Sequence, residues 1–155
     1  MKNLNKVILS IGTNIGNKTL NLKKSVELLG SKVKIKKVSS IYSSEALLFT
    51  EQADFFNIVL EIIYEDSPQN LLKILKIIEE DMGREQNFRY GPRIIDLDII
   101  FFNNQIVSEE NLQIPHYDWQ NRKFVIEPLF EILNKELVEE EFNISGQKVE
   151  VVGTI

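Results

Sequence analysis

Hydrophobic and polar positions along the chain recur with two different periods, which separate predicted strands from predicted helices. The clearest strand pattern covers residues 55–64, where every second residue from Phe56 to Tyr64 is apolar. The clearest helix pattern covers residues 68–82, with Ser67 as N-cap, Pro68 at the first helical position and Gly83 after the end. The complete pattern predicts strands over 4–11, 32–43, 55–64 and 94–102, and helices over 19–29 and 68–82.

This order, strand–helix–strand–strand–helix–strand, is typical of a ferredoxin-like fold. We therefore expect one α+β domain over residues 1–155, with a ferredoxin-like βαββαβ core, an antiparallel sheet and a C-terminal extension. Lys36 and Lys37 shift the alternation of the second strand, which predicts a β-bulge there. In the extension we expect a short strand over 105–107, loop and short helix within 117–133, and a last hairpin around Gly146.

The most informative segment is the strand that follows Gly91-Pro92-Arg93, because it carries two carboxylates in apolar surroundings. Side chains alternate across a strand, so Asp96 and Asp98 point to one face, about 7 Å apart. We expect Ile94, Ile100 and Phe102 on the same face, and Ile95, Leu97, Ile99 and Phe101 on the other. A run that is apolar on both faces predicts a strand in the middle of a sheet.

The two carboxylates would repel each other by roughly 2 kcal/mol at an effective dielectric constant of about 20. A fold retains such a pair if one Asp is protonated, if arginines neutralise it, or if it holds a cation. Carboxylates that hold divalent cations commonly handle nucleotide phosphates, and Arg93 adds a phosphate-matching guanidinium. The alternative is that Asp96 and Asp98 are simply solvated at a strand end; the apolar neighbours and the Gly-Pro-Arg segment favour the functional interpretation.

Composition narrows the function classes. The chain has no Cys, so disulfides, thiolate metal sites and Cys nucleophiles are excluded. A net charge of −5 argues against a general nucleic-acid binder. The apolar stretch Val7–Ile11 is too short for a membrane span or a signal peptide, so we expect a cytoplasmic protein without a membrane partner.

Three further segments are weaker candidates. Residues 12–19 imitate a phosphate-binding P-loop, but only three residues separate Gly12 from Gly16, and Asn17 precedes Lys18. His116 is the single histidine of the chain, and an isolated histidine is most often structural or exposed. The residues around it could nevertheless bind phosphate and a flat ring. The loop 84–92 is basic and aromatic, and it could close over a phosphorylated substrate or be an ordinary surface loop.

Three motifs together resemble the 6-hydroxymethyl-7,8-dihydropterin pyrophosphokinase family of folate biosynthesis. They are Ile11-Gly12-Thr13-Asn14-Ile15-Gly16, Gly91-Pro92-Arg93 with Asp96-Leu97-Asp98-Ile99-Ile100, and Pro115-His116 with Arg122, Phe124-Val125 and Pro128-Leu129. The resemblance implies transfer of pyrophosphate from ATP to the hydroxymethyl group of the pterin, with release of AMP. It also implies a monomer that does not bind nucleic acid.

The resemblance implies a role for each matching residue. The catalytic residues would be Arg84, Arg93, Asp96 and Asp98, with Asp96 and Asp98 holding two Mg²⁺ ions. The ATP site would comprise Lys76, Glu79, Arg84, Arg93, Ile99, Leu112, His116, Tyr117 and Arg122. The pterin site would comprise Ser44, Glu45, Leu47, Phe55, Asn57, Tyr90 and Phe124.

Two other functions remain alternatives at this point. A metal-dependent nucleotidyl transferase would use the same carboxylates but release pyrophosphate, and it would favour a more basic surface. A non-catalytic ferredoxin-like binding module would tolerate Asp96→Asn and would not bind nucleotide in a Mg²⁺-dependent way.

Overall fold

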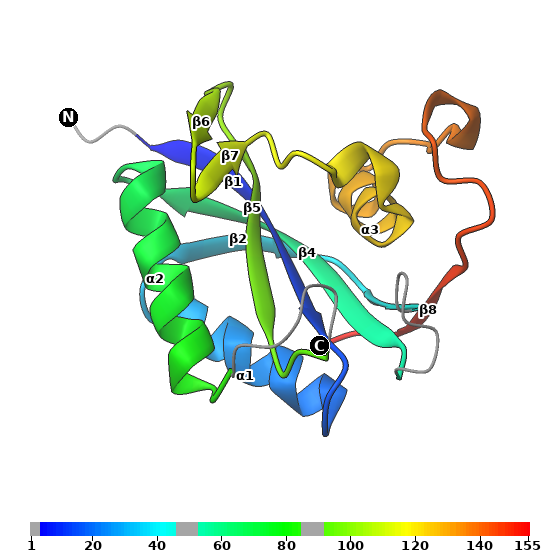
Figure 1. The fold of residues 1–155 in the computed structure, drawn as a ribbon, viewed down its shortest axis with the longest axis horizontal. Helices are drawn as coiled ribbons and strands as arrows, with labels where there is room; N and C mark the ends of the chain where they lie inside the picture. The colour runs from blue at the N-terminus through cyan, green and yellow to red at the C-terminus, as the bar shows by residue number, and fades with distance from the viewer. Residues whose placement is uncertain (1–3, 46–52, 85–91) are drawn as a thin grey trace.

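The computed structural model describes residues 4–45, 53–84 and 92–155, and it is built on one antiparallel sheet (Figure 1). In chain order the elements are β1 (Asn5–Thr13), α1 (Lys18–Gly30), β2 (Lys34–Val38), β3 (Ile41–Ser44), β4 (Phe55–Tyr64), α2 (Pro68–Asp81), β5 (Asp96–Phe102), β6 (Val107–Glu109), β7 (Leu112–Ile114), a 3₁₀ turn (Trp119–Asn121), α3 (Lys123–Leu133), a second 3₁₀ turn (Glu139–Glu141) and β8 (Val149–Gly153). The strand order is β5-β1-β4-β3-β8, with β2 also paired to β4.

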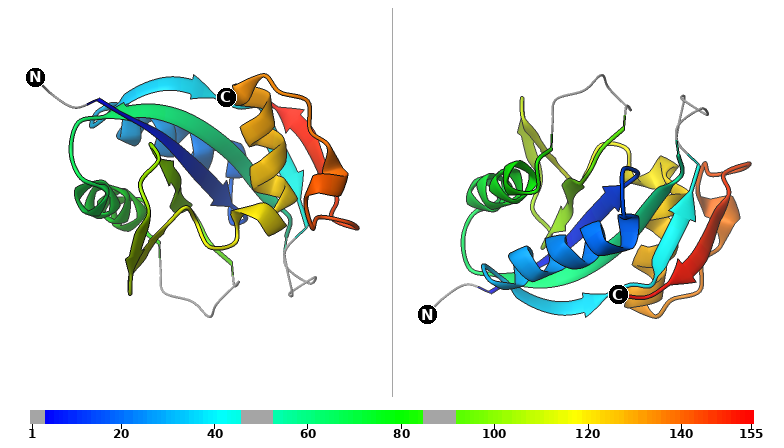
Figure 2. Two further views of the ribbon diagram at one scale, coloured as in Figure 1. Left: turned by 90° about the horizontal axis from the view of Figure 1, so that it is seen from above. Right: turned by 90° about the horizontal axis from the view of Figure 1, so that it is seen from below.

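Helices cover both faces of the sheet. Helices α1 and α2 lie on one face, over a core that includes Leu9, Leu60 and Leu75, and α3 lies on the other face with Val59 and Leu129. Figure 2 shows α3 in front of the sheet from above and α1 in front of it from below. Within the described residues, none of these helices has the length and apolar character needed to cross a membrane.

The two core helices confirm the sequence prediction closely. Asn17 caps α1 by accepting from the Leu20 amide at 3.1 Å, and Ser67 caps α2 by accepting from the Asn70 amide at 3.1 Å. These side chains satisfy amides that have no partner inside the helix, which fixes where each helix begins. The α2 stripe then buries Leu71, Leu75 and Ile78 against the sheet.

The strand predicted over 32–43 is divided into β2 and β3, both of which pair with β4. The division occurs at Ser39, whose hydroxyl accepts from the Val59 amide at 3.0 Å in place of a backbone carbonyl. The predicted bulge is confirmed, because the register of β2 against β4 shifts between Ile35 and Lys37. Strands β2 and β3 therefore belong to the same sheet because each of them pairs with β4.

Strand β5 differs from the prediction in two ways. It lies at an end of the sheet, not in its middle. Its apolar residues are nevertheless covered, because α2 packs against one of its faces and β7 also contacts it. Its register against β1 also shifts after Ile99, so that Phe101 packs on the α3 side and Phe102 in the core beneath α1 and α2. The predicted sides of these two phenylalanines are therefore reversed.

The C-terminal extension also differs in detail. The strand predicted over 105–107 is instead β6, which forms a two-stranded sheet with β7. The predicted last hairpin is absent from the described residues, because β8 pairs with β3 at the opposite end of the main sheet. Helix α3 packs mainly on β3, β4 and β8, and this leaves the ends of β1 and β5 uncovered on the same face.

Candidate active site

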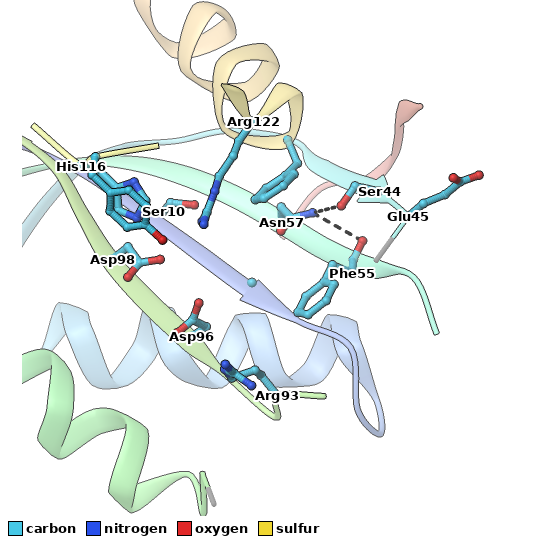
Figure 3. A pocket seen from close by; sticks show the side chains of 13 residues that line it. Ser10, Ser44, Glu45, Phe55, Asn57, Arg93, Asp96, Asp98, His116 and Arg122 are labelled. Carbon is cyan, nitrogen blue, oxygen red and sulfur yellow. Dashed lines mark hydrogen bonds between the residues drawn. The ribbon is translucent and has the colours of Figure 1, made fainter. Parts of the chain in front are cut away.

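A pocket of about 240 Å³ opens where α3 leaves the ends of β1 and β5 uncovered (Figure 3). Carboxylates, a histidine and arginines occupy one end, while an amide and two phenylalanines occupy the other. The lining residues are Ser10, Gly12, Ser44, Glu45, Phe55, Asn57, Arg93, Asp96, Asp98, His116, Tyr117, Arg122 and Phe124.

Asp96 and Asp98 project from β5 into the pocket, as alternation predicts (Figure 3). They lie opposite Gly12 and Ser10 of β1, respectively. Desolvation, followed by repulsion from Asp96, raises the pKa of Asp98 from 3.8 to about 7. Two close carboxylates, one of which resists ionisation, form a site that a cation would stabilise.

Arg84, which follows α2, connects Asp96 to the buried Glu79. Its Nη1 donates to Oδ1 of Asp96 at 2.9 Å and also to Oε2 of Glu79. The same Glu79 oxygen accepts from the Leu97 amide of β5 at 2.9 Å. Only 4% of the Glu79 side chain is exposed. The fold can bury this carboxylate because the Arg84 guanidinium and the Leu97 amide both donate to it.

His116 and Arg122 lie at the same end of the pocket as the two carboxylates (Figure 3). The His116 amide donates to the Ile100 carbonyl at 3.0 Å, and its Nδ1 accepts from the Asp118 amide at 3.1 Å. Arg122 is held by Asp118 through an Nε–Oδ2 distance of 3.1 Å. Burial, followed by the charge of Arg122, lowers the pKa of His116 from 6.5 to about 4, so its imidazole is neutral at pH 7.

The other end of the pocket combines a buried amide with two aromatic rings. Asn57 of β4 is buried, and its Nδ2 donates to Ser44 Oγ at 2.8 Å (Figure 3). Phe55 and Phe124 also line this end. Gly12 lies directly opposite Asn57, where an added Cβ would come within 3.0 Å of Asn57 Oδ1. A side chain at position 12 would therefore crowd the amide that faces the pocket.

The structure brings most of the predicted site residues together. Eleven line the pocket: Ser44, Glu45, Phe55, Asn57, Arg93, Asp96, Asp98, His116, Tyr117, Arg122 and Phe124. Lys76, Glu79 and Arg84 do not line it but form a chain of ion pairs that ends at Asp96. Ile99 and Leu112 are buried in the core, and Leu47 and Tyr90 lie outside the described residues.

Two lining residues were missed by the sequence analysis. Ser10 and Gly12 have no place in the roles that the family resemblance implies, yet both line the pocket, opposite Asp98 and Asp96. A signal for Ser10 is present in the sequence, because it is a polar residue inside the apolar run Val7–Ile11. Its pairing with Asp98, however, depends on which strands are neighbours, and that is a property of the fold.

Few side chains of the pocket are suited to bind a metal ion. No group of three or more His, Asp or Glu side chains suited to a metal occurs in the described part of the chain. Mg²⁺, however, is commonly bound by one or two carboxylates together with water and substrate phosphates. Asp96 and Asp98 fit that mode, and they do not fit a site made entirely of protein ligands.

Comparison with known proteins shows a family match and several similar sequences. The sequence model of the 7,8-dihydro-6-hydroxymethylpterin-pyrophosphokinase (HPPK) family matches residues 8–134. The chain is 37% identical over 150 residues to a 2-amino-4-hydroxy-6-hydroxymethyldihydropteridine pyrophosphokinase of Bacillus subtilis, which covers 94% of this chain and 90% of that protein. It is 40% identical over 130 residues to the bifunctional protein FolKE of Lactococcus lactis, covering 83% of this chain but 37% of that protein.

Solved structures agree on the fold. The HPPK-DHPS protein of Plasmodium falciparum, crystallised with pteroate, superposes with a TM-score of 0.67 at 16% identity, over 84% of this chain and 39% of that one. At this identity the likeness concerns the fold alone. The chain thus spans less than half the length of the FolKE and HPPK-DHPS proteins that it matches.

Proposed function

The chain belongs to the 7,8-dihydro-6-hydroxymethylpterin-pyrophosphokinase family, and on that premise we propose that it transfers pyrophosphate from ATP to 6-hydroxymethyl-7,8-dihydropterin. The hydroxymethyl oxygen loses its proton and forms a bond to the β-phosphorus of ATP, the bond from that phosphorus to the α-phosphate oxygen breaks, and AMP and the proton leave. One observation carries the proposal: a single pocket joins the carboxylates Asp96 and Asp98 to the amide and phenylalanines around Asn57.

The carboxylate end would receive the triphosphate. Asp96 and Asp98 would hold two Mg²⁺ ions, which would neutralise the phosphates and orient them for transfer. Arg93 and Arg122 line the pocket on either side of these carboxylates, so their guanidinium groups can bind phosphate oxygens. His116 is neutral at pH 7, so its imidazole can pair with the nucleotide without adding charge.

The remaining residues of the predicted ATP site would contact ATP or support such a contact. Tyr117 stacks on His116 with ring centroids 4.8 Å apart, and its exposed side could meet the ribose or base. Since Ile99 and Leu112 are buried, only their backbone could contact adenine. Arg84 would exchange Asp96 for a phosphate oxygen, while Lys76 and Glu79 would act through Arg84.

The opposite end would receive the pterin. The ring would lie between Phe55 and Phe124, and Asn57 would form hydrogen bonds with its amide edge. Ser44 would act by holding Asn57, and Glu45 would lie at the exposed rim. Roles for Leu47 and Tyr90 in pterin binding stay predictions.

We further infer that the βαββαβ core is ferredoxin-like, with β2 and β3 together as its second strand. The antiparallel order β5-β1-β4-β3 supports this inference. The single-domain organisation, the cytoplasmic location and the monomeric state stay predictions from the sequence.

The decisive experiment is an analysis of nucleotide products. The protein is incubated with ATP, Mg²⁺ and 6-hydroxymethyl-7,8-dihydropterin, with pterin-free and Mg²⁺-free controls. Formation of AMP that requires both pterin and Mg²⁺, and that is lost in Asp98→Asn, is the expected result. ADP would indicate simple phosphorylation, release of free pyrophosphate would indicate a nucleotidyl transferase, and either result would overturn the proposal.

A further inference from the structure

The segment that imitates a P-loop, between β1 and α1, has a different use in the structure. Asn14 lies in this segment, is 5% exposed, and bonds to two other parts of the chain. The side-chain Oδ1 of Asn14 accepts from the backbone amide of Arg93 at 2.8 Å, and the backbone amide of Asn14 donates to the Arg93 carbonyl at 3.0 Å. Its Nδ2 donates to the Ala53 carbonyl at 3.2 Å. One side chain therefore joins the chain before β5 to the chain before β4.

Both of the segments that Asn14 joins form walls of the pocket. Arg93 lines the carboxylate end, and Phe55, two residues after Ala53, lines the aromatic end. Figure 3 shows these two side chains on either side of the end of β1. Lys18, at the start of α1, adds a second link, because its Nζ donates to the Asp54 carbonyl at 3.1 Å.

The Asn14 segment is itself held by α1. Asn21 donates from Nδ2 to the Ile15 carbonyl at 2.8 Å. Side chains fixed by neighbours of this kind can hold reacting groups in place at little further entropic cost. Among the described residues, those between Gly12 and Gly16 do not line the pocket, so their hydrogen bonds are those of a support.

We infer that Asn14 is a positioning residue that fixes the phosphate-side wall at Arg93 and the pterin-side wall at Phe55 relative to each other. The inference rests on the proposed function, since it assigns the two walls to ATP and pterin. The two polar ends of the amide have separate tasks: the oxygen holds Arg93, and the nitrogen holds Ala53.

The test uses this division. Asn14→Asp keeps an oxygen for the Arg93 amide but replaces the donor to Ala53 with a second acceptor. We expect Asn14→Asp to weaken pterin binding about tenfold and to change the affinity for a non-hydrolysable Mg²⁺-ATP analogue by less than about threefold. Asn14→Ala, which loses both contacts, should weaken both ligands. Calorimetric titration with each ligand measures these affinities separately.

Asn17→Ala is the matched control. It lies three residues away and removes the cap of α1, which costs about 1 kcal/mol of stability, but no described hydrogen bond joins its side chain to Arg93 or Ala53. It should therefore lower the melting temperature and leave both affinities unchanged. Equal losses for both ligands in Asn14→Asp, wild-type affinities in both Asn14 variants, or loss of folding in both would overturn the inference.

Failure of the positioning role of Asn14 can be distinguished from failure of the proposed function. If the wild-type protein forms no pterin-dependent AMP, the proposed function fails. If it forms AMP and the Asn14 variants bind both ligands as tightly as the wild type, only the positioning role fails.

Discussion

Arg84 donates a hydrogen bond to Oδ1 of Asp96 across 2.9 Å, so a candidate metal carboxylate is paired with a guanidinium. Glu79 shares the same guanidinium nitrogen and fixes it from the buried side. Arg84 therefore offsets part of the repulsion between Asp96 and Asp98. A bound cation would take over that task and release Arg84 for a phosphate.

Glu79 is expected to matter for stability as much as for activity. Glu79→Ala should lower the free energy of unfolding by about 3 kcal/mol, because it leaves the buried Leu97 amide without an acceptor and Arg84 without its inner partner. Urea denaturation measures this. The control is Lys76→Ala: Lys76 lies 3.5 Å from Glu79 but is 58% exposed, so its removal should cost less than about 1 kcal/mol. Equal costs for the two variants would contradict this account.

The raised pKa of Asp98 predicts an unusual pH dependence of stability without Mg²⁺. In the unfolded chain Asp98 ionises near its ordinary pKa of 3.8, but in the folded protein it ionises near 7. Between these values the folded state binds the additional proton, so the free energy of unfolding should fall as the pH rises through this range. Asp98→Asn should lack that component and be more stable than the wild type at pH 8.

The comparison is made by urea denaturation of both proteins at several pH values, and identical pH slopes would refute the assignment. Mg²⁺ provides a second measurement, because a carboxylate must be deprotonated to bind it. The affinity of the wild-type protein for Mg²⁺ with an ATP analogue should therefore increase as the pH approaches about 7 and level off above it.

His116 should remain neutral throughout the physiological range. The chain has a single histidine, so its imidazole proton signals can be assigned without variants. They should not shift between about pH 8 and pH 5.5, and should titrate near pH 4. Because the unfolded chain takes up this proton near its ordinary pKa of 6.5, His116 should also reduce stability as the pH falls below that value. Arg122→Gln should raise the pKa of His116; an unchanged pKa would argue against its electrostatic influence.

Gly12 is expected to protect the pterin end of the pocket. Gly12→Ala should weaken pterin binding about tenfold, because the new Cβ displaces Asn57 Oδ1 at a cost near that of one hydrogen bond. Nucleotide affinity should change less. Gly153→Ala is the matched control, since nothing lies within 4 Å of the added Cβ. Fluorescence titration of the pterin distinguishes the two variants, and equal affinities would show that Gly12 is not required for close approach.

Local sequence signals predicted the elements whose limits are set by their own residues. Ser67 and Pro68 fixed the start of α2, and strict alternation fixed β4 and the shared face of Asp96 and Asp98. The lysines of β2 predicted a bulge that the structure has. In each case the residues that determine the feature belong to the element itself or directly precede it in the sequence.

The features that were missed depend on neighbours that are distant in sequence. An apolar pattern on both faces indicated a central strand, but β5 is an edge strand that α2 and β7 cover. The reversal of Phe101 and Phe102 follows from a shift in register against β1, which no property of residues 94–102 reveals. Ser10 joins the site only because β1 places it opposite Asp98.

The edge position of β5 has a consequence for the behaviour of the protein in a crowded solution. An unpaired strand edge invites hydrogen bonding with another molecule, and proteins usually block such edges. Here the Leu97 amide is occupied by Glu79, and the Ile100 carbonyl by the His116 amide. The side chains and backbone that surround the site therefore also guard the protein against strand-to-strand aggregation along β5, so variants at Glu79 should lose solubility as well as stability.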